Sequence, residues 1–220
     1  MDNTYKHQGL RKKLVEEIRE KGKKNQIVFS DKVLKAIETV PRHLFLDSSF
    51  LPYAYQEDIA FKIGANQTIS RPYTVAVQSE LLDIKKGDKI LEVGTGSGYQ
   101  TCVLLELGAK VFTIERQKEL YDKVQILLPT LGYNPKKIFY GDGYKGQPAF
   151  APFDKIIVTA GAPFIPDALL SQLKIGGLLV VPVGNNGVQV MTCVKKLAEN
   201  NFVKTEFGEF HFVPLLEEKE

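Results

Sequence analysis

The fold is decided by Lys89-Ile90-Leu91-Glu92-Val93-Gly94-Thr95-Gly96-Ser97-Gly98-Tyr99. An apolar strand at 89–93 runs into three alternating glycines, and the residues at 99–107 have a helical pattern. Glycines let the backbone turn sharply and approach a ligand closely. The helix behind them begins with unpaired N–H groups. The order of strand, glycine loop and helix predicts a ligand-binding edge of an α/β sheet.

Short apolar runs alternate with helical patterns beyond this loop. We expect strands at 110–114, 137–140, 155–159 and 178–183, with helices at 118–128 and around 166–173. Continuously apolar strands are typical of a parallel sheet that helices cover on both faces. After the turn at 184–187, runs at 188–195 and 201–212 indicate further strands, and the turn indicates a hairpin. The prediction is an α/β fold with a mostly parallel, doubly wound sheet and an antiparallel edge.

Helical patterns also precede the loop. Leu10, Leu14 and Ile18 lie on one face of an amphipathic helix, which we expect to stop at Gly22. A second helix is expected to begin at an N-cap, Ser30, and to end before Pro41.

The segment 41–69 has no sustained period, but it is too apolar for disorder, so we expect an ordered, irregular connection. Ser70 is the expected N-cap of a third helix that runs to about residue 82.

We expect one domain over 1–220. Its parts are a helical and substrate-loop region at 1–70, a cofactor-binding core at 71–183 and C-terminal strands at 184–220.

The composition is that of an ordinary soluble protein. The chain has 220 residues, 44% of them apolar and 25% charged, with a net charge of only +3. Such a balance gives no case for binding nucleic acid or a membrane surface. The two cysteines have no metal-ligand spacing, and we expect no metal. Without an apolar targeting segment, the expected location is the cytoplasm, and we expect a monomer.

The glycine loop favours S-adenosylmethionine over a dinucleotide. A dinucleotide site requires G-x-G-x-x-G/A, whereas the third glycine here, Gly98, arrives one residue early. A carboxylate at Glu92 would also repel a pyrophosphate, but a cationic sulfonium ligand would tolerate it. Glu115 ends the next strand at a spacing suited to hydrogen bonding with the ribose hydroxyls. Asp142, beside Gly143 after the third strand, is a candidate acceptor for an adenine amino group.

Seven motifs spread along the chain make the sequence resemble the protein-L-isoaspartate O-methyltransferase family. They are Val40–Phe45, Gln67–Pro72, Leu91–Gln100, Thr113–Arg116, Gly141–Gly143, the pair Pro152–Asp154 and Ile156–Ala160, and Phe212–Leu215. The glycine loop is shared with many methyltransferases. The Thr-Ile-Ser-x-Pro and Phe-Val-Pro-Leu segments are far more specific to this family.

The resemblance implies a Rossmann-like S-adenosylmethionine-dependent methyltransferase with added terminal elements. It implies methylation of isoaspartyl residues in damaged proteins, with S-adenosylhomocysteine as the second product and repair through a succinimide. Ser70 is then the active-site hydroxyl. The predicted cofactor-binding residues are Glu92, Gly94, Thr95, Gly96, Ser97, Gly98, Glu115, Asp142 and Gly143. The predicted substrate-binding residues are Ala65, Asn66, Gln67, Thr68, Ile69, His211 and Val213.

The sequence departs from the family pattern at two positions. Asn66 stands where the family usually has glycine before Gln-Thr-Ile-Ser, and His211 stands where it commonly has arginine before Phe-Val-Pro-Leu. Because asparagine tolerates a positive φ better than most residues, we expect the loop to keep its shape.

Three other functions remain open from the residues alone. They are a methyltransferase of the same fold that acts on a small molecule, an NAD-dependent oxidoreductase, and a non-catalytic protein-binding module. Assays with isoaspartyl peptide and a cofactor titration separate them.

Overall fold

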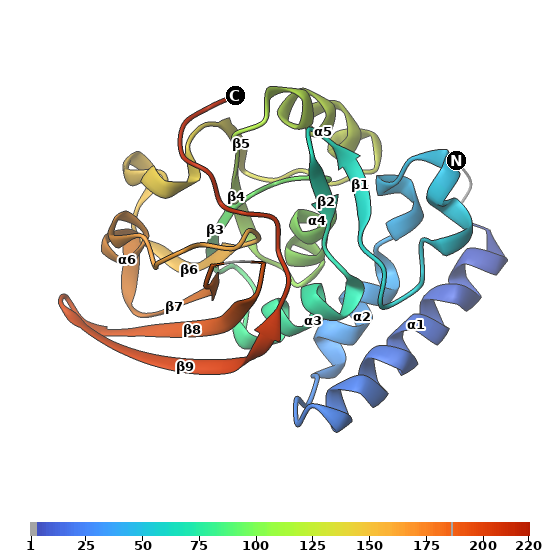
Figure 1. Ribbon diagram of the computed structural model, residues 1–220, viewed down its shortest axis with the longest axis horizontal. Coiled ribbons are helices and arrows are strands. Elements are labelled where there is room, and N and C mark those ends of the chain that lie inside the picture. Colours follow the sequence, from blue (N-terminus) through green and yellow to red (C-terminus); the bar gives the residue numbers. More distant parts are fainter. Residues whose placement is uncertain (1–3, 186) are drawn as a thin grey trace.

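A large twisted sheet forms the centre of the molecule (Figure 1). The structure, a computed structural model, describes residues 4–185 and 187–220. In this part of the chain, the sheet has seven strands in the order β5-β4-β3-β6-β7-β8-β9. The strands are β3 (Lys89–Val93), β4 (Lys110–Glu115), β5 (Lys137–Tyr140), β6 (Phe153–Val158), β7 (Leu173–Val183), β8 (Gln189–Ala198) and β9 (Asn201–Phe210).

The strand directions confirm the predicted fold class. The pairs from β5 through β4, β3 and β6 to β7 are all parallel, whereas β8 pairs antiparallel with both β7 and β9. Strand β7 begins earlier than expected, because Leu173 already pairs with Phe153 directly after the helix α6 (Asp167–Gln172). The turn between β7 and β8 includes Asn186, which lies outside the described residues.

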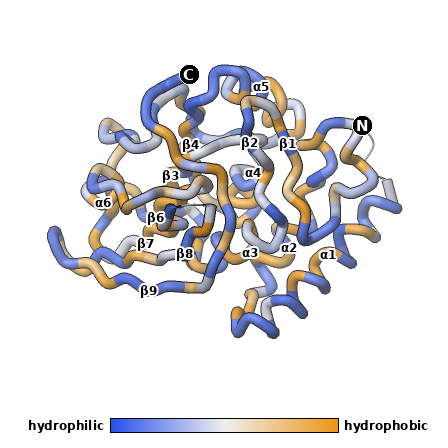
Figure 2. The backbone as a smooth tube through the Cα atoms, viewed as in Figure 1, coloured by the Kyte–Doolittle hydropathy of each residue, from blue (hydrophilic) through white to orange (hydrophobic). Residues whose placement is uncertain are grey.

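Each face of the sheet is covered. The helices α3 (Pro72–Leu81), α4 (Tyr99–Glu106) and α5 (Lys118–Thr130) share one apolar core, whereas α6 packs into a second. Successive strand side chains point to opposite faces. In β3, Ile90 joins the first core, while Leu91 and Val93 join the second. The central strands are accordingly apolar along most of their length (Figure 2).

Two N-terminal helices extend the first layer. They are α1 (Tyr5–Lys24) and α2 (Asp31–Thr39), and α2 packs against α3 and α4. The expectation that Gly22 stops the first helix is wrong, because the helix continues to Lys24. A Cβ at Gly22 would lie 2.6 Å from the carbonyl oxygen of Ile27 and from the ring of Phe29. The glycine therefore permits a close approach of the returning chain.

The segment 41–69 has more regular structure than expected. It contains two 3₁₀ helices, η1 (Arg42–Phe45) and η2 (Ser48–Tyr53), and an antiparallel hairpin of β1 (Phe61–Gly64) and β2 (Gln67–Ile69). At the hairpin turn, Ala65 and Asn66 have φ of 46° and 54°. Asn66 thus adopts the positive φ that the sequence argument expected of it.

Ser70 is not the N-cap of α3, so that prediction is wrong by one residue. Arg71 is the N-cap and Pro72 is the first helical residue. The Ser70 side chain is therefore not used to cap the helix. Within residues 4–185 and 187–220, its hydroxyl makes no hydrogen bond, so it is available to a ligand.

Among the described residues, no helix is both long and apolar enough to cross a membrane.

Candidate active site

A cavity of about 780 Å³ opens at the carboxyl ends of the central parallel strands. It is bounded by Val93 at the end of β3, by Glu115 at the end of β4 and by Thr159 just after β6. This edge, where the strand order reverses about β3, is where open α/β sheets bind their ligands.

Most of the predicted site residues line this cavity. They are Gln67, Thr68, Ile69, Ser70, Gly94, Thr95, Gly96, Ser97, Glu115, Gly143 and Val213. The remaining predicted residues lie outside its lining. They are Ala65, Asn66, Glu92, Gly98, Asp142 and His211.

The glycine loop is fixed by its backbone contacts. Gly94 has φ of 96°, and a Cβ there would collide with the hydroxyl of Thr159, which donates to the Gly94 carbonyl at 2.6 Å. Gly98 has φ of 84° and caps α4, and a Cβ there would lie 2.6 Å from a methyl group of Leu128. Gly98 therefore supports the loop from behind instead of contacting the cavity.

Glu115 joins the loop to the neighbouring strand. Its carboxylate accepts hydrogen bonds from the backbone N–H groups of Gly96 at 2.7 Å and of Gln117 at 2.8 Å. The side chain is buried, and this burial raises the pKa of Glu115, although the backbone N–H donors oppose the rise. A carboxylate so placed holds the loop and presents acceptors at the cavity wall.

Glu92 is a buried residue beneath the loop. Its side chain is fully buried, and Thr101 Oγ1 donates a hydrogen bond to its Oε2 at 2.5 Å. Burial raises the pKa of Glu92 to about 8, which favours the protonated carboxyl group at neutral pH. The sequence argument treated Glu92 as an anion that repels pyrophosphate, and its burial removes most of that repulsion.

We expect Glu92 to make folding stability depend on pH. Folding raises its pKa from about 4.5 to about 8, so the stabilisation is complete below pH 4.5 and is lost as the pH rises toward 8. At about 1.4 kcal/mol per pH unit, the loss between about pH 6 and pH 7.5 is about 2 kcal/mol. Urea unfolding of the ligand-free wild type and Glu92→Gln at both pH values measures this, because the mutant lacks the titration.

The difference in unfolding free energy, mutant minus wild type, should therefore grow with pH. Glu16→Gln is the control, because Glu16 is exposed on α1. Parallel pH profiles for wild type and Glu92→Gln would contradict a raised pKa.

Asp142 and Gly143 lie after β5. Asp142 caps the 3₁₀ turn η3 (Gly143–Lys145), where its Oδ1 accepts from the backbone N–H of Tyr144 at 2.9 Å. Gly143 reaches the cavity wall, and a Cβ there would collide with Val93. The Asp142 side chain therefore caps the local turn, and the backbone of the adjacent Gly143 lines the cavity.

Two further hollows adjoin the cavity and contain the other predicted substrate residues. The first, the outer hollow, is lined by Thr68, Ser70, Arg71, His211 and Val213 together with Ala60, Thr74, Thr159 and Phe212. The second, the turn hollow, contains Ala65 and Asn66 beside Gln117 and Glu220. Ser70 therefore lies at the junction between the glycine-loop cavity and the side where His211 is found.

Val213 was predicted from the C-terminal segment, but three residues that follow it were not. Pro214, Leu215 and Leu216 line the cavity, and the backbone of 213–215 pairs with Gly161. The segment then crosses the molecule and ends beside β5 and α5 (Figure 1). Thr159 was also not predicted to line the cavity. Its position directly after the carboxyl end of a parallel strand could have indicated that it does.

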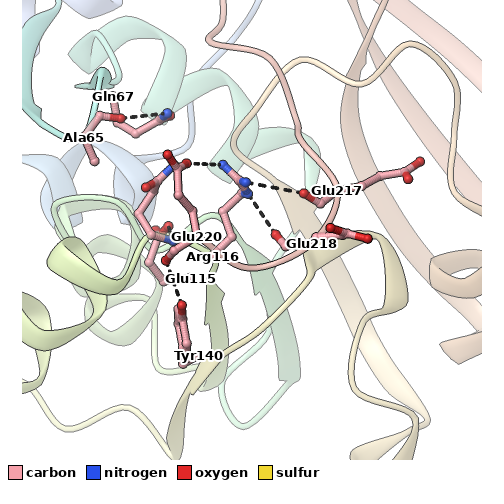
Figure 3. Close-up of polar contacts among 9 residues, drawn as sticks. Ala65, Gln67, Glu115, Arg116, Tyr140, Glu217, Glu218 and Glu220 are labelled. Carbon is pink, nitrogen blue, oxygen red and sulfur yellow. Dashed lines mark hydrogen bonds and ion pairs between the residues drawn. The ribbon is translucent and has the colours of Figure 1, made fainter.

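Arg116 anchors this segment (Figure 3). Its guanidinium donates to the carbonyl oxygens of Glu217 and Glu218 at 3.4 and 2.9 Å, and to Glu220 Oε2 at 3.0 Å. Tyr140 donates its hydroxyl to the Glu220 carbonyl oxygen at 2.7 Å. These hydrogen bonds hold the C-terminal segment against Arg116, the residue that directly follows Glu115.

Arg116→Ala should weaken cofactor binding, because the cavity wall at 214–216 loses its anchor. Several hydrogen bonds are lost at a half-buried position, and we expect the Kd for S-adenosylhomocysteine to rise about tenfold. Isothermal titration calorimetry measures this change. Arg116→Lys should recover part of the affinity, and Arg19→Ala on α1 should leave it unchanged. An unaltered Kd in Arg116→Ala would show that the anchor does not support the site.

The residues present suit S-adenosylmethionine. Bare backbone at Gly94 and Gly96 provides close approach, and the Glu115 carboxylate provides acceptors for a ribose. Among the described residues of the cavity wall, the other charged side chain is Arg116, whose guanidinium is already engaged by the C-terminal segment.

The sheet order, the glycine loop and the acidic end of β4 define the class of Rossmann-like S-adenosylmethionine-dependent methyltransferases. The family model described as protein-L-isoaspartate(D-aspartate) O-methyltransferase matches residues 11–220. The chain belongs to this family.

Curated relatives and solved structures agree with this assignment. Proteins named protein-L-isoaspartate O-methyltransferase from Christiangramia forsetii and Flavobacterium psychrophilum are 61% and 60% identical over 219 residues, which is 100% of each chain. A solved structure of the same name has a TM-score of 0.80 at 29% identity, over 93% of this chain and 65% of that one.

A second solved structure is similar in fold. It is a Plasmodium falciparum protein described as a β-aspartate methyltransferase, in complex with S-adenosyl-L-homocysteine. Its TM-score is 0.76 at 24% identity, over 91% of this chain and 97% of that one.

Proposed function

We propose that this protein transfers a methyl group from S-adenosylmethionine to the free carboxylate of L-isoaspartyl residues in damaged proteins and peptides. The observation that carries the proposal is the position of Ser70. Its hydroxyl, free of hydrogen bonds within the described residues, lines both the glycine-loop cavity and the outer hollow. Membership of the family supports the choice of acceptor.

The cofactor-binding residues would be the loop Gly94–Gly98, Glu115 and Gly143, with Gly98 and Glu92 acting from behind the loop. When bound, S-adenosylmethionine supplies an electrophilic methyl group on a positively charged sulfur. Glu115 would accept hydrogen bonds from the ribose, and Asp142 would contribute through the backbone turn that it caps.

The hairpin β1–β2 and the C-terminal segment would hold the substrate. Gln67, Thr68 and Ile69 would support an extended polypeptide, together with Val213, which lines the same cavity. Ala65, Asn66 and His211 would contact the substrate only at the rim, because they line the adjoining hollows.

The reaction needs no general base. A carboxyl group with an ordinary pKa near 4 is ionised at neutral pH. Ser70 would donate a hydrogen bond to one carboxylate oxygen, and the other oxygen would attack the methyl carbon. The new C–O bond forms as the C–S bond breaks, and the electron pair of that bond stays on sulfur. The products are a neutral ester and a neutral thioether, and no proton moves.

Alignment is then the main catalytic contribution. Holding two reactants in a near-attack geometry can lower the barrier by about 7–11 kcal/mol. The methyl ester carries a better leaving group than the free carboxylate, because attack of the neighbouring backbone amide nitrogen on its carbonyl carbon releases methanol as that nitrogen loses its proton. It can therefore close to a succinimide, whose hydrolysis partly returns normal aspartate.

The test is methyl transfer to matched peptides. Two peptides of one sequence, with isoaspartate or aspartate at one position, are incubated with labelled S-adenosylmethionine and the purified protein. Label that is incorporated into the isoaspartyl peptide alone supports the proposal. Equal labelling of both peptides, or labelling of neither, would overturn it.

The oligomeric state, the location and the range of partners are also proposals. We propose that the protein acts as a monomer in the cytoplasm, without nucleic-acid or membrane partners. The low net charge and the interspersed acidic and basic residues support this. We further propose that residues 1–70 contribute the substrate loop, that residues 71–183 form the cofactor-binding core and that residues 184–220 form the closing strands.

A further inference from the structure

The active-site cavity continues into a long groove at the surface. The outer hollow shares Thr68, Ser70, Thr159 and Val213 with the cavity. Beyond it lies a larger hollow of about 1220 Å³ between the end of α1, the start of α3 and the strand β9, here called the α1 groove. The α1 groove shares Arg71, Thr74 and His211 with the outer hollow. The cavity, the outer hollow and the α1 groove therefore adjoin one another in a row from Ser70 to the carboxyl end of α1.

Several polar side chains of the α1 groove are already paired with one another. Lys21 Nζ lies 2.6 Å from Glu57 Oε1, and Asn25 Nδ2 donates to the hydroxyl of Tyr73 at 2.8 Å. The ion pair neutralises the charge of Lys21, and the hydrogen bond satisfies the amide of Asn25.

Arg71 differs from its neighbours. It is exposed, follows Ser70 directly in the chain and lines both the outer hollow and the α1 groove. Within the residues that the structure describes, its guanidinium forms neither an ion pair nor a hydrogen bond. The inner end of the groove thus has an unpaired positive charge beside the proposed reacting hydroxyl. The acidic residues of the groove's other wall, Glu206 and Glu209, lie on β9.

We propose that the α1 groove binds the polypeptide that flanks the isoaspartyl residue, and that Arg71 selects an acidic side chain close to that residue. The inference rests on the proposed function. An extended chain whose reacting carboxylate is at Ser70 must leave the cavity through an opening, and the outer hollow provides one that leads past Arg71.

The charge of Arg71 decides the preference. A guanidinium at an exposed position attracts a carboxylate and repels an ammonium group, and each interaction changes affinity about twofold to fivefold. The contact is present before and during the reaction alike, so it should alter KM and leave kcat nearly unchanged. The preference should fall at high salt, because exposed charges are screened.

The experiment compares isoaspartyl peptides that have one glutamate or one lysine at a position one to three residues from the isoaspartate, on either side. For the wild type, we expect a KM about twofold to fivefold lower for a glutamate peptide than for its lysine counterpart at one or more positions. Arg71→Gln should remove the preference for the glutamate peptide, and Arg71→Glu should produce a preference for the lysine peptide, because Glu206 and Glu209 remain in the groove.

The matched control is Arg19→Gln, which removes the same charge from α1 at a position outside the groove. It should keep the wild-type preference. Equal KM values for glutamate and lysine peptides with the wild type would overturn the role of Arg71 while leaving the proposed function intact. A preference that survives in Arg71→Glu would overturn it too. Failure to methylate any isoaspartyl peptide would instead contradict the proposed function.

Discussion

Glu115→Ala is expected to raise the Kd for S-adenosylhomocysteine about 100-fold or more. The wild-type carboxylate has two tasks: it would accept hydrogen bonds from the ribose, and it accepts them from the backbone N–H groups of Gly96 and Gln117. Hydrogen bonds to a charged group contribute about 1.5–3 kcal/mol each, so the loss of two such bonds is enough for this effect. The two N–H groups would also lose their partner, which loosens the glycine loop.

Calorimetric titration of S-adenosylhomocysteine measures the change, with thermal unfolding as a check that the mutant is folded. Glu115→Gln separates the two tasks. Its amide oxygen can still accept one backbone N–H, but its NH₂ group cannot accept the second. An intermediate loss of affinity is therefore expected. Glu16→Ala, at an exposed position on α1, should leave the affinity unchanged. A folded Glu115→Ala protein with wild-type affinity would remove Glu115 from the proposed site.

Ser70→Ala is expected to lower kcat about 10- to 100-fold and to change the Kd for S-adenosylhomocysteine less than twofold. The mutation removes one hydrogen bond to an ionised carboxylate, which is worth about 1.5–3 kcal/mol when it orients the reacting group. Stability should change little, because Arg71 and not Ser70 caps α3. Single-turnover kinetics with isoaspartyl peptide isolates the chemical step from product release.

Ser70→Thr keeps the hydroxyl and should recover part of kcat. Ser171→Ala, at an exposed position on α6, controls for the loss of a serine hydroxyl elsewhere. A Ser70→Ala enzyme with wild-type kcat would exclude the proposed hydrogen bond. A large fall in cofactor affinity would assign Ser70 to the cofactor site.

The central features of the site could be predicted from local sequence. The strand and helix on either side of Gly94–Gly98 are recognisable within a short stretch, because continuous apolar runs and helical periodicity are local patterns. Glu115 could be found because parallel neighbouring strands place their carboxyl ends at one edge of the sheet. The positive φ of Asn66 was expected because the family usually has glycine at this position and asparagine tolerates such a backbone better than most residues.

Other features depend on burial or packing, which the sequence does not show. Glu92 lies in the glycine motif, but nothing in the sequence shows that its carboxyl group is fully buried under the loop. Glycine is a common helix-stop residue, but Gly22 lies inside the helix and leaves room for the ring of Phe29 that packs against it. Ser70 is a favourable N-cap residue by type, and the chain nevertheless starts the helix one residue later.

The sequence by itself determined the sheet class, the ligand-binding edge and the residues of the glycine loop and of β4 that reach it, because each depends on contacts between near neighbours or on the general geometry of parallel strands. Only the tertiary structure decided which carboxyl groups are buried, how the chain beyond β9 closes the cavity and where the groove beyond Ser70 leads. Those features join residues that are far apart in sequence, such as Arg116 and Glu220, which are separated by 104 positions. Contacts of that kind depend on how the whole chain packs, and no local pattern encodes them.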